Sequence, residues 1–339
     1  MHMADALVSP VVGGALWAAS AGLIAYGSKK IRQEGDDGRV PLMGVLGAFI
    51  FASQMINFTI PGTGSSGHLG GGMILAILLG PWAAFLTLAS VLTVQALFFA
   101  DGGLLALGCN MFNLGFFPCF VAYPLIYQRI VGSSPTRGRV MAGAMASAVV
   151  GLQLGALAVV AETLFSGVSD LPFASFALLM QPIHLAIGVV EGLATAAVVL
   201  FVARARPEIL EARGAATPGS MGFRKMLLML LAAAVVIGGG LSWFASTHPD
   251  GLEWSLFHAT GKEEMESPGG VHDSLARVQE KTAILPDYGF REGAAGEAGE
   301  SRPAVSTQTS VSGLVGGALT LALAGIIGLL VRRKKKGEG

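Results

Sequence analysis

Charged residues are scarce in this chain. Lys, Arg, Asp and Glu make up 13% of its 339 residues, whereas soluble domains carry about 25%. Hydrophobic residues make up 53%, and the mean hydropathy is +0.64. This composition excludes an ordinary soluble domain and predicts a membrane protein.

Several catalytic and redox signatures are also missing. The two cysteines, Cys109 and Cys119, lie in an apolar segment at a spacing that fits neither a zinc motif nor a disulfide framework, so we expect buried free thiols. No GxxxxGK[ST] sequence occurs, so a pump built on this chain needs a separate ATPase. An HExxH pair is absent as well, which argues against a membrane metalloenzyme. Basic residues form no groove with interleaved aromatics, so nucleic-acid binding is not expected.

The basic residues that are present fall into clusters between hydrophobic segments. We identify nine such segments, at roughly 11–26, 41–57, 69–79, 82–100, 104–127, 140–164, 183–202, 226–245 and 311–331. The clusters lie near residues 29–39, 129–139, 204–225 and 332–336. By the positive-inside rule these are cytoplasmic. The sequence thus predicts an all-α polytopic transmembrane helix bundle in the cell inner or plasma membrane, with its N-terminus outside and its C-terminus cytoplasmic.

The polar stretch before the eighth segment divides the chain. We expect a metal-binding transmembrane part at 1–206, a cytoplasmic linker at 207–225, and a second part at 226–339. The second part has two transmembrane helices and an external loop at about 247–310, whose end is rich in Gly, Ala, Glu and Ser and is expected to be flexible. In the first segment, Gly14, Ala18 and Gly22 form a small-residue stripe that either packs within the chain or docks a partner.

The first two residues, Met1 and His2, form a chelating group. The Met1 amine, the deprotonated His2 backbone nitrogen and the near ring nitrogen of His2 can close two fused rings on a metal. Three nitrogens then lie in one plane, an arrangement that favours Ni(II) or Cu(II). The first apolar run lacks a basic segment before it, so no cleavable signal peptide is evident and we expect Met1 to be retained.

A glycine-rich loop supplies a candidate fourth ligand, His68. The stretch Gly62 to Gly72 contains a literal GxGxxG, but it follows a hydrophobic helix rather than a strand, which excludes a dinucleotide-binding loop. Its glycines permit tight turns that could bring His68 to the N-terminal segment. His68 is otherwise an ordinary surface or buried histidine, and spacing alone does not decide between these interpretations.

Polar residues at membrane depth are costly and usually face a protein interior. Those that could orient the ligands or the N-terminal segment are Asp5, Asn57, Gln95, Asp101, Asn110, Asn113, His184 and Glu191. His184 and Glu191 share one helix face, where a hydrogen-bond network between helices is the alternative to metal contact. His248, His258 and His272 are irregularly spaced and indicate no site.

Several blocks resemble a known family in order. The opening MHMADALVSP resembles the MHI-x-DG-x-L-x-P start of the CbiM/NikM family, with Met3 for Ile and Ala6 for Gly. Residues 60–72, the block from Gln95 through Asp101 to Asn110 and Asn113, and His184 with Glu191 match later family motifs. The PDGLE sequence at 249–253 resembles the NikN/CbiN-like small subunit, so the whole is similar to a fused NikMN protein.

The resemblance implies a substrate-binding component of an energy-coupling factor (ECF) ABC transporter that is itself no enzyme and has no cofactor. It implies import of Ni(II), or alternatively Co(II), held by Met1, His2 and His68. The implied partners are a transmembrane coupling subunit of the NikQ/CbiQ type and an ATPase subunit of the NikO/CbiO type. A signalling or assembly protein that acts through its external acidic segment is a further alternative.

Overall fold

The computed structural model describes residues 2–34, 39–133, 135–169, 171–209, 221–262, 265–291 and 306–332. Met1 lies outside the described residues, and so do most of the glycine-rich stretch before the last helix and the lysines that follow Arg332.

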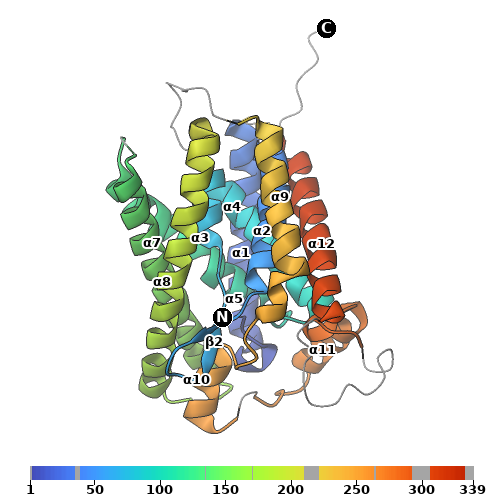
Figure 1. Ribbon diagram of the computed structural model, residues 1–339. Coiled ribbons are helices and arrows are strands. Elements are labelled where there is room, and N and C mark those ends of the chain that lie inside the picture. The colour runs from blue at the N-terminus through green and yellow to red at the C-terminus, as the bar shows by residue number, and fades with distance from the viewer. Residues whose placement is uncertain are drawn as a thin grey trace.

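The chain folds into a bundle of long helices with a small cap at one end (Figure 1). The helices of the first part are α1 (Pro10–Glu34), α2 (Arg39–Gln54), α3 (Gly72–Leu79), α4 (Pro81–Val94), α5 (Leu107–Met111), α6 (Gln128–Val131), α7 (Arg137–Ser166) and α8 (Phe173–Ala205). Two π-helical stretches, Gln95–Phe99 and Phe112–Tyr127, extend α4 and join α5 to α6. The second part contributes α9 (Phe223–Gly239), α10 (Gly251–Thr260), α11 (Val271–Thr282) and α12 (Thr307–Val331).

Each of the nine predicted hydrophobic segments coincides with a helix or a run of joined helices. Six of them are long and apolar enough to cross a membrane by length and composition, and α2 is a shorter apolar helix. The short segment α3 is buried along its whole length, because α4 and the Phe112–Tyr127 stretch cover it. The prediction of an all-α, multi-pass membrane protein is confirmed.

Small residues allow α7 and α8 to approach closely. A methyl group added at Gly188 would lie 2.9 Å from the Cα of Val149, and one at Gly192 would lie 2.8 Å from the Cα of Met145. Glycine is needed at both positions because the two backbones leave no room for a side chain. This contact fixes α8, which carries His184 and Glu191.

The stripe on α1 does not pack within the chain. Nothing lies within 4 Å of a methyl group added at Gly14 or Gly22, and Ala18 is exposed. The buried face of α1 instead carries Gly13, Ser20, Gly27 and Ile31. The alternative of packing within the chain is therefore wrong for this stripe, while docking of a partner stays a prediction.

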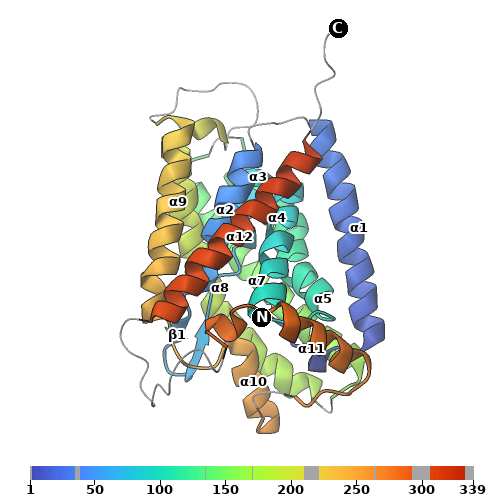
Figure 2. The same ribbon diagram turned by 90° about the vertical axis from the view of Figure 1, so that its right-hand side faces the viewer.

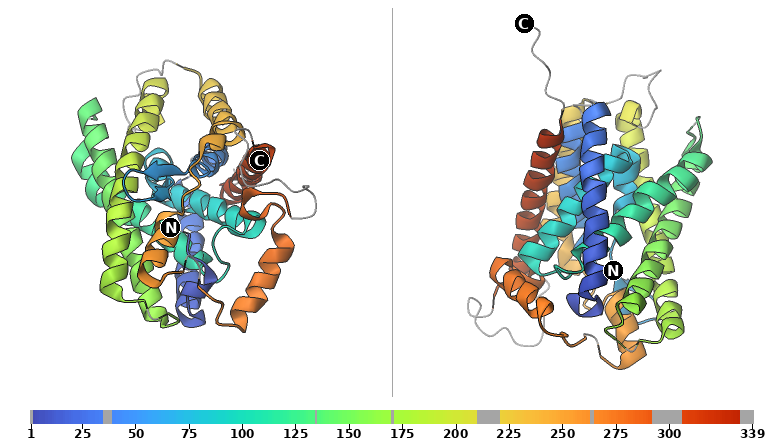
Figure 3. Two further views of the ribbon diagram at one scale, coloured as in Figure 1. Left: turned by 60° about the horizontal axis from the view of Figure 1, so that its bottom comes forward. Right: turned by 180° about the vertical axis from the view of Figure 1, so that it is seen from behind.

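The second part is interleaved with the first. Helix α12 crosses α2 and also contacts α4 and α9 (Figure 2). The described residues of the expected external loop are largely helical, because α10 and α11 form there and lie across the lower end of the bundle (Figure 3). The Asp250–Glu253 capping box, in which each side chain accepts from the other's backbone N–H, starts α10.

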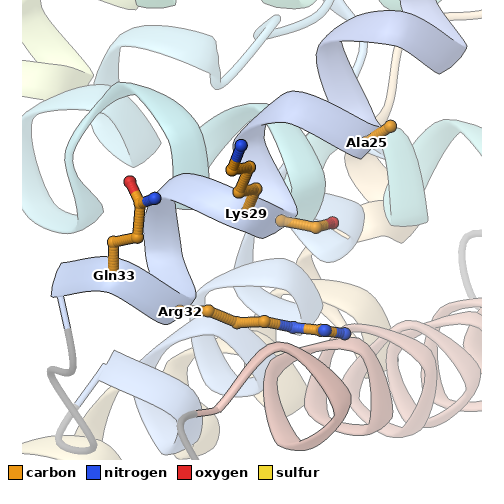
Figure 4. Close-up of a pocket in the computed structure, with 5 residues that line it drawn as sticks. Ala25, Lys29, Arg32 and Gln33 are labelled. Carbon is orange, nitrogen blue, oxygen red and sulfur yellow. The ribbon is translucent and has the colours of Figure 1, made fainter.

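Lys29 and Arg32 of the first basic cluster lie near the end of α1, at the upper end of the bundle. A hollow of about 580 Å³ there is lined by Ala25, Ser28, Lys29, Arg32 and Gln33 of α1 (Figure 4). The Arg32 guanidinium donates to the carbonyl of Leu330 on α12 at 3.2 Å. Neither His2 nor His68 lines this hollow.

Candidate metal site

The N-terminal segment is held inside the lower end of the bundle. The Asn110 side chain makes two hydrogen bonds to the backbone of Met3. Its Oδ1 accepts from the Met3 N–H at 2.8 Å, and its Nδ2 donates to the Met3 carbonyl at 3.3 Å. The Gly103 N–H donates to the same carbonyl at 2.9 Å. The Asn113 amide lies 3.7 Å from the Met3 sulfur and donates to Glu162 at 2.8 Å. Asn110 and Asn113 thus position His2 through the residue next to it.

Asp5 fixes the next turn of the same segment. Its Oδ1 accepts from the Ala106 N–H at 2.9 Å. Burial raises the pKa of Asp5 above its usual value, although this hydrogen bond opposes the rise. Gly103 lies so close to Asp5 that a methyl group added at Gly103 would fall 1.8 Å from the Asp5 carboxylate.

Replacing Gly103 with alanine should therefore displace the N-terminal segment. We expect Gly103→Ala to weaken metal binding by at least about tenfold, as loss of a supporting contact around a metal does, and to cost about 1–3 kcal/mol from overpacking. The control is Gly14→Ala, where the added methyl group meets open space. Equal metal affinity in the two variants, measured by titration calorimetry, would contradict the prediction.

The two candidate histidines lie together although 66 positions separate them in the chain. The rings of His2 and His68 stack with centroids 5.1 Å apart and an angle of 14° between their planes. The Nδ1–H of His68 donates to the Leu69 carbonyl at 3.1 Å, which leaves the Nε2 lone pair free for a metal. Loss of surrounding water lowers the pKa of His68 to about 4, so its ring is neutral at pH 7, as ligation requires.

Asp101 contacts the edge of the His2 ring. Ala100 adopts a left-handed conformation, with a φ of 56°, as the chain turns out of the π-helical stretch. Asp101 Oδ1 then lies 3.0 Å from Nδ1 of His2, and the Tyr288 hydroxyl donates to Asp101 Oδ2. Burial alone would raise the pKa of Asp101, but His2 and these hydrogen bonds hold it well below its usual range. Chelation through Nδ1, the near ring nitrogen, requires the contact with Asp101 to break.

A short hairpin carries His68. Strands β1 (Phe58–Ile60) and β2 (Ser65–Gly67) pair antiparallel, with Phe58 opposite Gly67. The turn between them uses Gly62 and Gly64 at φ values of 78° and 75°, which other residues rarely adopt.

Three buried polar side chains fix the loop after His68. Glu191 accepts from the Gly70 N–H at 2.7 Å and from the Gly71 N–H at 3.1 Å. Gln54 donates to the Gly70 carbonyl at 2.9 Å, and Gln95 donates to Gln54 at 2.8 Å. Glu191 and Gln54 therefore hold the loop backbone, and Gln95 acts on it only through Gln54.

Glutamine at position 191 should loosen this loop. Glu191→Gln keeps one acceptor and turns an N–H₂ group towards a buried amide, so we expect about 1–3 kcal/mol lower stability and metal binding weakened by about 10–100-fold. The matched control is Glu280→Gln at an exposed position of α11. Metal affinity and thermal unfolding of both variants check the expectation. An unchanged affinity in Glu191→Gln would show that this loop does not position the site.

The remaining predicted residues separate into one near the site and one away from it. His184 lines a small cavity with His68. Asn57 instead meets the second part, since its carbonyl accepts from the Ser246 N–H at 2.7 Å. Cys109 and Cys119 are buried free thiols. Within the described residues, no group of three or more His, Cys, Asp or Glu side chains is arranged to hold a metal.

The second part closes over the hairpin in a way that the sequence did not reveal. The N–H and hydroxyl of Ser66 donate to the carbonyls of Pro249 and His248 at 2.8 and 2.9 Å. The Trp254 indole donates to the Thr63 carbonyl at 2.9 Å. The Asp-x-x-Glu capping pattern was the one local signal that a helix begins here.

Helix α11 covers the N-terminal segment. The ring nitrogen Nε2 of His272 donates to the Val8 carbonyl at 2.9 Å. Gln279 donates to the carbonyls of Ala96 and Gly102 at 2.8 and 2.7 Å. His272 is thus a buried structural contact, in line with the absence of any site pattern around it.

Comparison with known proteins accounts for both parts of the chain. Residues 2–209 match the family described as "Cobalt uptake substrate-specific transmembrane region", and residues 224–333 match the PDGLE domain. A putative metal transport protein of Haloquadratum walsbyi is 36% identical over 62% of this chain and 93% of its own length. A putative fused nickel transport protein NikMN of Archaeoglobus fulgidus is 34% identical over 65% of this chain and 71% of its own.

A solved structure, that of a truncated transition metal transporter, aligns with a TM-score of 0.53 at 32% identity. The alignment covers 60% of this chain and 98% of that one. The family match includes both His2 and His68. The chain therefore belongs to the family of cobalt uptake substrate-specific transmembrane regions, the CbiM/NikM type, and is a PDGLE-containing membrane component of metal transport rather than an enzyme.

Proposed function

We infer that this chain is the substrate-binding component of an ECF-type ABC transporter, and that it binds and imports divalent nickel. The observation that carries the proposal is the stacking of His2 on His68 beneath the cap formed by α10 and α11. Two imidazoles from distant parts of the chain are brought together, and one of them has its tautomer set for ligation.

The proposed ligands are four nitrogens in one plane. They are the Met1 amine, the His2 backbone nitrogen and Nδ1, and Nε2 of His68. Met1 lies outside the described residues, so its part rests on the sequence. The His2 backbone nitrogen and Nδ1 must each release a proton or a hydrogen bond when the cation binds, so binding releases protons and weakens in acid. The hydrogen bond that Nδ1 must release is the one to Asp101.

Nickel is favoured over cobalt by this ligand geometry. Planar nitrogen ligation suits Ni(II), whereas cobalt gains less from a planar arrangement. The name of the Archaeoglobus relative agrees with nickel, and the family description names cobalt, so cobalt is the second candidate.

Transport needs partners that this chain does not supply. Its sequence contains no P-loop, so the proposal assigns ATP hydrolysis to a NikO/CbiO-type subunit. A NikQ/CbiQ-type coupling subunit would link that ATPase to the helix bundle. The exposed stripe of Gly14, Ala18 and Gly22 on α1 is open to such a neighbour.

The test is direct competition between the two ions. We expect the full chain, reconstituted in liposomes with both partner subunits, to take up Ni(II) in an ATP-dependent manner and to prefer it at equal Co(II). Purified chain should carry one nickel ion. Preference for Co(II) would overturn the assignment of nickel, stoichiometric zinc would support an enzyme, and absence of any bound metal would favour a signalling role.

A further inference from the structure

Tyr288 connects the second part of the chain to the proposed metal ligand His2. Its hydroxyl donates to Asp101 Oδ2, while Asp101 Oδ1 accepts from the Nδ1–H of His2 at 3.0 Å. The Asp101 carboxylate is therefore shared between a donor from the first part and a donor from the second part. Tyr288 is not itself among the proposed ligands, so any effect it has on the metal passes through Asp101.

The chain holds the Tyr288 hydroxyl in this place at a conformational cost. Tyr288 ends the short 3₁₀ turn Pro286–Tyr288, in which Asp287 and Tyr288 adopt φ values of 49° and 59°. Such left-handed conformations are costly for residues other than glycine, and they persist only where surrounding contacts impose them. In the part of the chain that the structure describes, Ala100 is the only other non-glycine residue with a positive φ. Ala100 immediately precedes Asp101, so all three of these residues flank one hydrogen bond.

Packing contacts keep Tyr288 in this conformation. Its ring stacks on Phe99, with centroids 5.0 Å apart and an angle of 21° between the planes. The Ser312 hydroxyl of α12 donates to the Tyr288 carbonyl at 2.9 Å, and the Leu285 N–H donates to the Phe98 carbonyl at 3.1 Å. These contacts fix the ring and the backbone without using the hydroxyl, so the hydroxyl can be removed while the turn persists.

The hydrogen bond to Asp101 and metal chelation exclude each other at His2. Nδ1 carries a hydrogen when it donates to Asp101, whereas a metal ion needs the lone pair of the same nitrogen. The Asp101 side chain is 22% exposed, so a carboxylate without a second anchor can turn towards water. Tyr288 supplies that anchor by binding Oδ2, which keeps Oδ1 directed at Nδ1.

We propose that Tyr288 is a positioning residue that holds Asp101 in competition with the metal ion for Nδ1 of His2. The proposal rests on the proposed function and adds a residue of the second part that limits the affinity of the site. A transport component must release its cargo as well as bind it. A carboxylate held ready to reclaim Nδ1 favours that release.

The test is removal of the hydroxyl alone. Tyr288→Phe keeps the ring on Phe99 and the charge of Asp101. We expect the full chain to bind Ni(II) about tenfold more tightly in isothermal titration, which corresponds to the loss of one competing hydrogen bond of about 1.4 kcal/mol. Damage to the fold would weaken binding, so the direction of the change separates competition from a structural role. Tyr26→Phe is the matched control, because Tyr26 is 50% exposed on α1, and it should leave the affinity unchanged.

A double-mutant cycle shows whether Tyr288 acts through Asp101. In an Asp101→Ala background, Tyr288→Phe should no longer change the affinity for Ni(II). Thermal unfolding verifies that each variant folds. In a chain that binds Ni(II), unchanged or weaker binding in folded Tyr288→Phe would overturn the proposal, and so would an equal gain with and without Asp101.

A measurement without metal separates this proposal from the proposed function. Nitrogen-15 NMR of the histidine-labelled chain reports the hydrogen on Nδ1 of His2, with the signal assigned by its loss in His2→Ala. We expect this signal to shift in Tyr288→Phe and to stay in place in Tyr26→Phe. If it shifts while no chain binds Ni(II) tightly, the proposed function fails and the positioning of Asp101 by Tyr288 stands. If the unmodified chain binds Ni(II) tightly and Tyr288→Phe changes neither the signal nor the affinity, the opposite holds.

Discussion

Adding a four-residue leader before Met1 is expected to abolish tight Ni(II) binding. The extension replaces the terminal amine with a peptide nitrogen and moves the α-amine out of reach of the His2 chelate. The rest of the protein should be unaffected, because the first described contacts of the segment are made by His2 and by the Met3 backbone. We expect a loss of more than about 100-fold in affinity, beyond the effect of removing a supporting contact.

The control for this experiment is removal of the leader by a protease, so that Met1 again becomes the first residue. Full Ni(II) affinity should then return in the same sample. His2→Ala should resemble the extended chain, because it deletes the near ring nitrogen. Tight binding that survives the leader would mean that the amine is not a ligand, whatever the role of His2.

The second large effect is expected from His68→Ala. This change removes the fourth nitrogen and the stacking partner of His2, so water must complete the plane. We expect Ni(II) affinity to fall by about 100-fold or more. The loop itself should persist, because Glu191 and Gln54 hold the Gly70 and Gly71 backbone.

His258→Ala is the control for this second variant, since His258 is exposed on α10. Isothermal titration with both ions would detect a further consequence. Without the fourth nitrogen, the preference for Ni(II) over Co(II) should narrow. A His68→Ala protein that keeps both its affinity and its preference would exclude His68 from the metal.

Much of the helical architecture could be predicted because it is local. A hydrophobic run can be recognised from neighbouring residues alone, without knowledge of distant contacts. All nine predicted runs correspond to a helix or to joined helices. Spacing in the sequence alone did not decide whether His68 lies beside His2. The structure brings the two rings together.

What could not be predicted depends on contacts between distant segments. No periodicity indicates that Ser66 will meet Pro249, or that Tyr288 will donate to Asp101. The helices in the described part of the expected external loop could not be predicted for the same reason. Helices α10 and α11 are short, and they pack against the first part of the chain.

The buried N-terminal segment also has a consequence for the timing of biosynthesis. Met3 is held by Gly103 and Asn110, which lie about a hundred positions later in the chain. At roughly 5–20 residues per second, the ribosome needs several seconds to make those partners, and longer to make the cap that contacts Val8 through His272. The residues synthesised first must therefore wait for partners that are made much later before they reach their final positions.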